Sequence, residues 1–204
     1  VLVHLCALVD RSLVLAEMAG AETRYRLLET VRQYAAERLG ASGDAEVVRR
    51  RHVEYFVDVA ERAAAERFGA KRDAAVAPMR ADLDNVRAAL RWSTERDAAL
   101  FVRLAFGQGW CYFAWGLWRE GRDWLERALR LPGGAHRDGA RARALSDLAY
   151  LAGHQGDFGR SRQAFEESME IWAELGNPRE RALAAQMLAQ TYLFEGSAAS
   201  VQLP

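Results

Sequence analysis

Three glycines at a constant spacing constrain the second half of this chain more than any other feature. Gly116, Gly156 and Gly196 follow one another every 40 residues, and each joins two stretches with the apolar period of an α-helix. A unit of two helices cannot bury its apolar face alone and therefore stacks on its neighbours. We expect an array of helical hairpins, which is a scaffold for binding rather than a site built for bond-making.

Small residues recur on both sides of each predicted turn. They stand seven positions before the glycine (Gly109, Ala149, Ala189) and five after it (Gly121, Ser161), and large residues stand nine after it (Leu125, Phe165). We expect Gly109 to touch Gly121, and Ala149 to touch Ser161, across their hairpins. The pattern resembles the tetratricopeptide repeat from about residue 98 to 196. Its period exceeds the usual ~34 residues, and the surplus falls in loops at 132–134 and 176–178.

The first forty residues follow a different pattern. We expect a helix over residues 1–10, a strand over 12–17, a turn at 19–21 and a returning strand over 23–28. A helix should then begin with a capping box, in which Thr30 is paired with Gln33, and end at Gly40. Helix, hairpin and helix together form the closing half of a winged-helix domain.

Four strings carry a more specific resemblance. They are LVDRSLV (8–14), RYRLLETVRQYAAERL (24–39), DNVRAALRW (84–92) and GRDWLERAL (121–129). They look like the region after the nucleotide-binding domain of bacterial STAND-type signalling ATPases, many of which are transcriptional regulators. The resemblance implies an upstream P-loop domain that binds ATP, a winged helix packed against it, and a tetratricopeptide sensor arm. No Gly-x-x-x-x-Gly-Lys-Ser/Thr occurs here, so no cofactor is expected in this chain.

The predicted fold class is mainly α: an α-α superhelix of tetratricopeptide-like hairpins preceded by a partial winged helix with a small β-hairpin. We expect three parts, at 1–41 (winged helix), 42–97 (helical connector) and 98–204 (repeats, the third truncated). Within the connector we expect one helix from Asp44 to about Arg67, with Tyr55, Val59 and Ala63 on one face and His52 and Phe56 beside them. A second should run over 79–95, with Pro78 in its first turn. The chain is interpreted as a fragment of a longer protein.

The resemblance to tetratricopeptide proteins implies that the other face of each first helix lines a concave groove. The residues predicted there are Arg103, Phe106, Trp110, Phe113, Arg143, Ser146, Tyr150, Gln186 and Gln190. Arginine beside aromatic and amide side chains suits an acidic or C-terminal peptide, a small effector, or an intramolecular partner such as the nucleotide-binding domain. The competing interpretation is that the tryptophans around Trp110 simply fill the core.

Charge and composition exclude several other classes of function. The formal net charge is zero, and residues 1–60 hold eight arginines against nine acids, so direct DNA contact is not expected. The sequence has no 18-residue apolar stretch and no signal peptide, which indicates a cytoplasmic protein without membrane contact.

No catalytic or metal-binding spacing appears, because the four histidines are scattered, and Cys6 and Cys111 are expected to be buried. We therefore expect no enzymatic activity in this chain, although the parent would carry an ATPase domain. The alternative to a sensor arm is a DNA-binding winged-helix regulator with a helical dimerisation domain.

Overall fold

The computed structural model describes residues 2–19, 22–67 and 69–201 of the chain. They are mainly helical, with one two-stranded antiparallel sheet, which confirms the broad fold class. The chain divides into two compact units, residues 1–49 and 50–204, and each is described by itself. None of the helices described is long and apolar enough to cross a bilayer.

The first unit has the predicted order of helix, hairpin and helix. It comprises α1 (Leu2–Asp10), β1 (Val14–Ala19), β2 (Glu22–Leu27) and α2 (Glu29–Ala41). The strands pair antiparallel, with Val14 opposite Leu27 and Ala19 opposite Glu22. β1 begins two residues later than predicted, and part of the predicted turn at 19–21 lies outside the described residues. Val14 is the one buried hydrophobic residue described in this unit, so the hairpin has little core of its own.

Both predicted ends of α2 are wrong. The helix begins at Glu29 with Leu28 at the N-cap and has no side-chain cap, and Gln33 donates a hydrogen bond of 2.9 Å to Glu29 instead of closing a capping box. Gly40 lies inside the helix. The left-handed residue is Gly43, at φ +79°, because Ser42 first turns the chain by bonding back to the Leu39 carbonyl.

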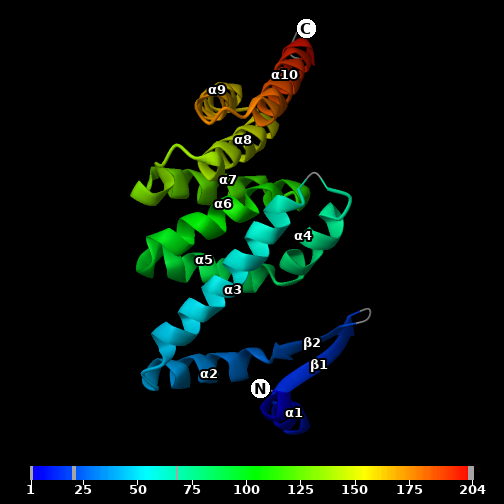
Figure 1. Cartoon of the computed structure of the whole chain (residues 1–204). Coiled ribbons are helices and arrows are strands. Elements are labelled where there is room, and N and C mark those ends of the chain that lie inside the picture. The colour runs from blue at the N-terminus through cyan, green and yellow to red at the C-terminus, as the bar shows by residue number, and fades with distance from the viewer. Residues whose placement is uncertain (1, 20–21, 68, 202–204) are drawn as a thin grey trace. The chain divides into compact units, whose positions relative to one another are not determined.

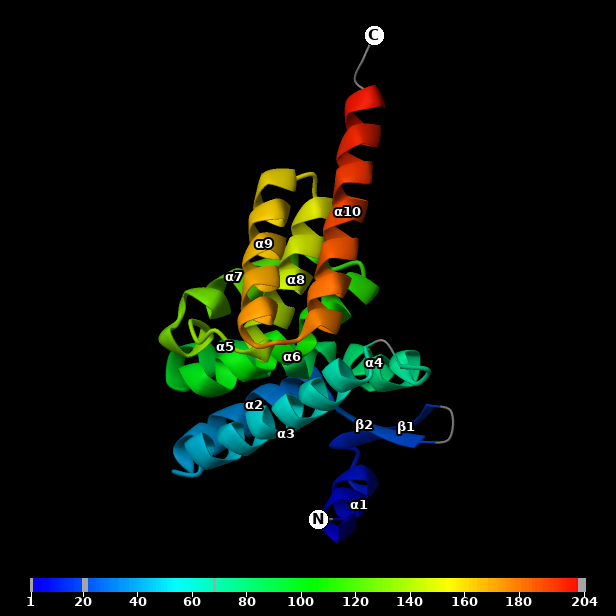
Figure 2. The same cartoon turned by 45° about the horizontal axis from the view of Figure 1, so that its top comes forward.

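The second unit is entirely helical apart from its loops. Its elements are α3 (Ala45–Ala65, which begins in the first unit), α4 (Arg72–Ala81), α5 (Leu83–Arg96), α6 (Ala98–Ala114), α7 (Trp118–Arg130), the short 3-10 helix η1 (Pro132–Gly134), α8 (Gly139–His154), α9 (Phe158–Glu174) and α10 (Pro178–Val201). α6 to α10 follow one another in chain order, and α8, α9 and α10 lie side by side (Figures 1 and 2).

Three helix ends in this unit share one backbone geometry. Gly116, Gly156 and Gly176 have φ of +72°, +79° and +64°. After each glycine, the next N–H donates to the carbonyl five residues earlier: Leu117 to Tyr112 (3.0 Å), Asp157 to Ala152 (3.0 Å) and Asn177 to Trp172 (2.9 Å). This is the Schellman motif, which ends a helix with a left-handed glycine. The helix ends at Gly116 and Gly156 confirm the turns predicted at those two positions.

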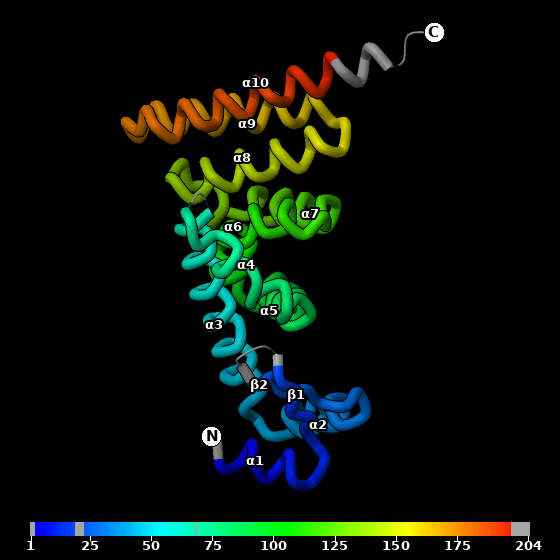
Figure 3. Tube along the Cα trace, turned by 90° about the vertical axis from the view of Figure 1, so that its right-hand side faces the viewer, coloured from blue at the N-terminus to red at the C-terminus, as the bar shows by residue number. Residues whose placement is uncertain are grey.

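The predicted turn at Gly196 is wrong, because that glycine lies within α10. The chain already turns at Gly176, and Asn177 then starts α10 by accepting the Glu180 N–H at 3.2 Å. A single glycine inside a helix costs only about 1 kcal/mol, so the helix continues through it. α10 passes alongside α9 as one long rod (Figure 3), and the third hairpin is absent from the described residues.

The small residues permit close approach of neighbouring helices. A Cβ on Gly121 would overlap Tyr112, with 2.7 Å to the Tyr112 Cγ. A Cβ on Gly109 would lie 2.9 Å from a carboxylate oxygen of Asp147 and 3.2 Å from a methyl group of Leu125, and a Cβ on Gly153 would lie 3.2 Å from the Ser161 Oγ. α7 therefore packs against α6 at two places, through Leu125 at Gly109 and through Gly121 at Tyr112.

The connector also differs from the prediction. The segment expected as one helix over 79–95 forms α4 and α5 with a break at Asp82, and Pro78 lies inside α4 rather than at a helix start. Tyr55 of α3 is 59% exposed, because the buried face is formed by Val53, Phe56, Val57, Ala60 and Ala63.

The two cysteines differ in environment. Cys111 is buried in the core of the second unit, and this burial raises the pKa of its thiol to about 12. Cys6 is exposed on α1, so its predicted burial is wrong.

Candidate ligand-binding pocket

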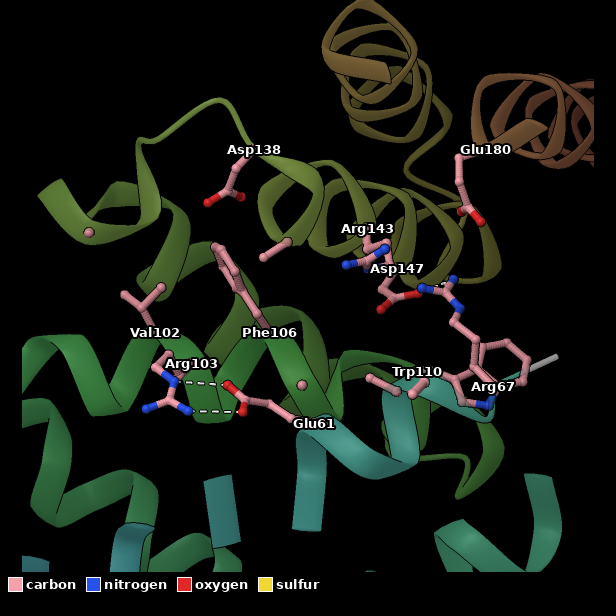
Figure 4. Close-up of a pocket in the computed structure, with 15 residues that line it drawn as sticks. Glu61, Arg67, Val102, Arg103, Phe106, Trp110, Asp138, Arg143, Asp147 and Glu180 are labelled. Carbon is pink, nitrogen blue, oxygen red and sulfur yellow. Dashed lines mark hydrogen bonds and ion pairs between the residues drawn. The ribbon is translucent and has the colours of Figure 1, made fainter. Parts of the chain in front are cut away.

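A cavity of about 520 Å³ opens within the second unit, where α3, α6 and α8 converge near the start of α10 (Figure 4). Fifteen residues line it: Glu61, Ala64, Ala65, Arg67, Val102, Arg103, Phe106, Gly107, Trp110, Gly133, Asp138, Ala140, Arg143, Asp147 and Glu180. A volume of this size is typical of sites for small organic ligands.

A buried ion pair forms one wall of the pocket. Arg67 Nη2 donates to Asp147 Oδ1 at 2.8 Å, with side chains only 7% and 5% exposed, and the Arg67 guanidinium lies 5.9 Å from the centre of the Trp110 ring. Burial raises the pKa of Asp147, although Arg67 and Arg143 act in the opposite direction. Gly109 leaves room for the Asp147 side chain, since a Cβ there would collide with its carboxylate.

A second ion pair lies at the rim of the pocket. Arg103 donates two hydrogen bonds to Glu61, at 2.8 and 2.9 Å, which raises the pKa of the guanidinium. Both side chains are about half exposed, 51% and 45%. Such a pair adds little stability but fixes the direction of both side chains, as the dashed lines of Figure 4 show.

Arg143 is a cation of the pocket wall that forms no direct ion pair. Its guanidinium lies 5.6 Å from the centre of the Trp172 ring, and no acid of the described residues forms an ion pair with it. Two carboxylates also line the pocket, each at the start of a helix. Asp138 caps α8 by accepting the Arg141 N–H at 2.9 Å, and Glu180 lies in the first turn of α10.

Four of the nine predicted groove residues line the pocket: Arg103, Phe106, Trp110 and Arg143. Phe106 and Trp110 are half-buried and form its aromatic wall. Ser146 points elsewhere: it is buried, and its Oγ lies 2.9 Å from that of Ser168. Gln186 and Gln190 are exposed on α10 and do not line the cavity.

Phe113 and Tyr150 belong to a neighbouring aromatic cluster. Their ring centres are 4.5 Å apart, and His154 lies 5.0 Å from Phe113, 4.4 Å from Tyr150 and 5.2 Å from Trp118. Phe194 of α10 reaches the same histidine at 5.5 Å. This cluster joins α6, α7, α8 and α10 by ring packing. For these aromatic residues, that supports the competing interpretation that they pack between helices instead of lining a groove.

The sequence prediction missed Arg67, Asp147 and Glu180. Asp147 has a visible signal, because it is the one charged residue between Arg143 and His154 of α8. Arg67 and Glu180 lie outside the helix faces that the repeat pattern compares, so the pattern contains no signal for them.

Outside the pocket, a repeated ion pair ties successive helices together. Arg122 Nη2 lies 2.6 Å from Asp157 Oδ2, and 40 residues on, Arg162 Nη1 lies 2.6 Å from Glu195 Oε2. The hydrogen bond from Arg122 lowers the pKa of Asp157. The other Asp157 oxygen caps α9 by accepting the Arg160 N–H at 3.1 Å.

Nothing in this arrangement is a metal centre: the described residues hold no group of three or more His, Cys, Asp or Glu side chains placed to bind an ion. The pocket instead combines an aromatic wall, two internal ion pairs, one free guanidinium and two carboxylates. It is suited to holding a ligand by stacking and charge.

Comparison with known proteins finds relatives named as regulators. The chain is 40% identical over 156 residues to "Putative HTH-type transcriptional regulator Mb0914c" of Mycobacterium bovis and to "Putative HTH-type transcriptional regulator Rv0890c" of Mycobacterium tuberculosis. The match covers 74% of this chain. The chain spans only 18% of the length of each relative. No protein-family model matches the chain, and no solved structure matches it.

Proposed function

We propose that this chain is the non-catalytic sensor and interaction arm of a bacterial transcriptional regulator of the STAND type. In this proposal α6 to α10 act as tetratricopeptide-like repeats, and the first unit is part of a winged helix. ATP would bind an upstream domain of the parent protein. The similarity to two mycobacterial proteins with regulator names supports the regulatory role.

The observation that carries the proposal is the pocket itself. Four side chains that the tetratricopeptide resemblance places on the groove face, Arg103, Phe106, Trp110 and Arg143, line one cavity. A protein, peptide or small effector held there would contact α3, α6, α8 and α10 together. Its binding would be coupled to the relative position of these helices.

A chromosomal experiment tests the proposal. In the cell that carries the gene, Phe106→Ala with Arg143→Glu should change the same transcripts as deletion of the gene, measured by RNA sequencing at equal protein level. Arg127→Gln is the matched control, because Arg127 also stacks on a tryptophan, at 5.1 Å from Trp124, but lies outside the pocket. Transcripts unchanged from wild type in the double variant would reject a role for the pocket in regulation.

The second candidate is a winged-helix regulator that contacts DNA through the first unit, and the names of the two mycobacterial relatives favour it. The arginines of that unit favour the sensor arm instead. Arg26 pairs with Glu17 at 2.9 Å, Arg32 pairs with Glu29 at 2.6 Å, and Arg38 lies over the Tyr34 ring. Binding of the chain to generic duplex DNA, weakening steeply with added salt, would support the second candidate.

A further inference from the structure

The charges that the pocket does not neutralise internally indicate which ligand it fits. Arg67 pairs with Asp147, and Arg103 pairs with Glu61. One guanidinium, that of Arg143, and the carboxylates of Asp138 and Glu180 then remain to meet a ligand. Asp138 already accepts the capping hydrogen bond of α8. Glu180 is therefore the freer of the two acids.

This pattern disfavours ligands of a single charge. A purely anionic ligand would pair with Arg143 but face carboxylates beside it, and a purely cationic ligand would pair with Glu180 but face the guanidinium. A ligand with both charges satisfies both groups. Guanidinium binds a carboxylate with two parallel hydrogen bonds, and a compact ammonium suits a single carboxylate.

The uncharged surface of the pocket indicates the body of the ligand. Phe106 and Trp110 offer half-buried rings, and Ala64, Ala140 and Gly107 add small surfaces without hydrogen-bonding side chains. Aromatic rings pair well in offset or edge-to-face contact. The volume of about 520 Å³ suits a small molecule rather than a folded domain.

We propose that the pocket binds a small zwitterion with an aromatic body, as a free aromatic amino acid has, with its carboxylate on Arg143 and its ammonium on Glu180. The proposal rests on the sensor function given above and names the class of effector. It distinguishes a free small molecule from either end of a peptide chain, because each chain end carries only one of the two charges.

Three probes with the same indole body separate these cases by isothermal titration calorimetry on the 204-residue chain. L-tryptophan carries both charges, N-acetyl-L-tryptophan only the carboxylate, as a peptide C-terminus does, and L-tryptophanamide only the ammonium. We expect L-tryptophan to bind at least about tenfold more tightly than either of the others. Equal affinity for N-acetyl-L-tryptophan would overturn the proposal in favour of a peptide C-terminus, and equal affinity for the amide would overturn it in favour of a cation.

Charge-neutral variants assign the two contacts. Arg143→Gln should lower the affinity for L-tryptophan and N-acetyl-L-tryptophan about tenfold or more and leave the affinity for the amide unchanged. Glu180→Gln should lower the affinity for L-tryptophan and the amide and leave the affinity for N-acetyl-L-tryptophan unchanged. Arg127→Gln should change none of the three affinities. Circular dichroism should show the same helicity for all variants and the wild type. Absence of binding by all three probes at millimolar concentration would overturn the ligand class. In that event a transcript change in the Phe106→Ala, Arg143→Glu strain would leave the sensor function standing.

Discussion

Arg67 and Asp147 meet across the pocket at 2.8 Å although 80 residues separate them in the chain. The pair joins the segment just after α3 to the middle of α8 and is nearly removed from solvent. α3 lies outside the predicted repeats, so this contact makes the pocket a property of the connector and the repeats together.

Removing one partner of this pair should destabilise the second unit strongly. Asp147→Ala would leave the Arg67 guanidinium buried without its carboxylate, and breaking a buried pair costs about 3–5 kcal/mol of unfolding free energy. Urea denaturation, monitored by circular dichroism, measures this loss of unfolding free energy. The control is Glu61→Ala in the half-exposed pair with Arg103, which should cost at most about 1 kcal/mol. Equal losses in the two variants would contradict the burial of the Arg67–Asp147 pair.

The contact between α6 and α7 should tolerate no side chain at Gly121. A Cβ there would overlap Tyr112 and approach Leu151, so Gly121→Ala should lower the unfolding free energy by about 1–3 kcal/mol through overpacking. At Gly133 the nearest atom to a new Cβ would be 3.9 Å away. Thermal melts of Gly121→Ala and Gly133→Ala give the comparison, and a wild-type midpoint for Gly121→Ala would show that the helices are not in this contact.

Two glycines 40 residues apart should respond to alanine with opposite signs. Gly156 has φ +79°, where an L-residue costs about 1–2 kcal/mol, so Gly156→Ala should destabilise the chain. Gly196 lies inside α10 with open space around it, and Gly196→Ala should raise stability or helicity, by up to about 1 kcal/mol. The sign of the Gly196 effect, read from urea midpoints and ellipticity, checks that α10 is continuous: a loss of stability there would indicate a turn.

The Arg122–Asp157 pair should make stability depend on pH in the acid range. The pKa of Asp157 is lowered in the folded state, chiefly by the hydrogen bond from Arg122, so unfolding takes up a proton as the pH falls. The contribution of this pair to the free energy of unfolding is complete above the ordinary Asp pKa near 3.8. It is lost as the pH falls from there through the lowered pKa of the folded state. Asp157→Asn keeps an N-cap but loses the charge. The difference in urea midpoint between wild type and Asp157→Asn should therefore shrink below about pH 4, and a difference independent of pH would exclude this pair as its source.

The sequence predicted local features of the chain better than contacts between helices. The left-handed turns at Gly116 and Gly156 were predictable, because glycine between two apolar periodic stretches is a signal within the sequence. The partner of Gly121 was not, since a repeat spacing aligns equivalent positions but does not say how far one helix slides along another. Gly196 shows the same limit, because the stronger helix end at Gly176 lies outside the 40-residue series.

The pocket was predictable only from one side. α6 and α8 supply Arg103, Phe106, Trp110 and Arg143, which the tetratricopeptide resemblance places on the groove face. On α8 the lining face is formed by Ala140, Arg143 and Asp147, one position away from the predicted Ser146. Arg67 follows α3 and meets this face only through tertiary packing, which periodicity does not encode.

The turn at Gly176 repeats the backbone geometry of those at Gly116 and Gly156, although it joins what were predicted to be separate hairpins. α7 ends differently, because Leu131 at its C-cap is extended and η1 follows it. A left-handed glycine consequently occurs both inside a hairpin and between two hairpins, so the position of such a turn does not by itself mark where one structural unit stops and the next begins.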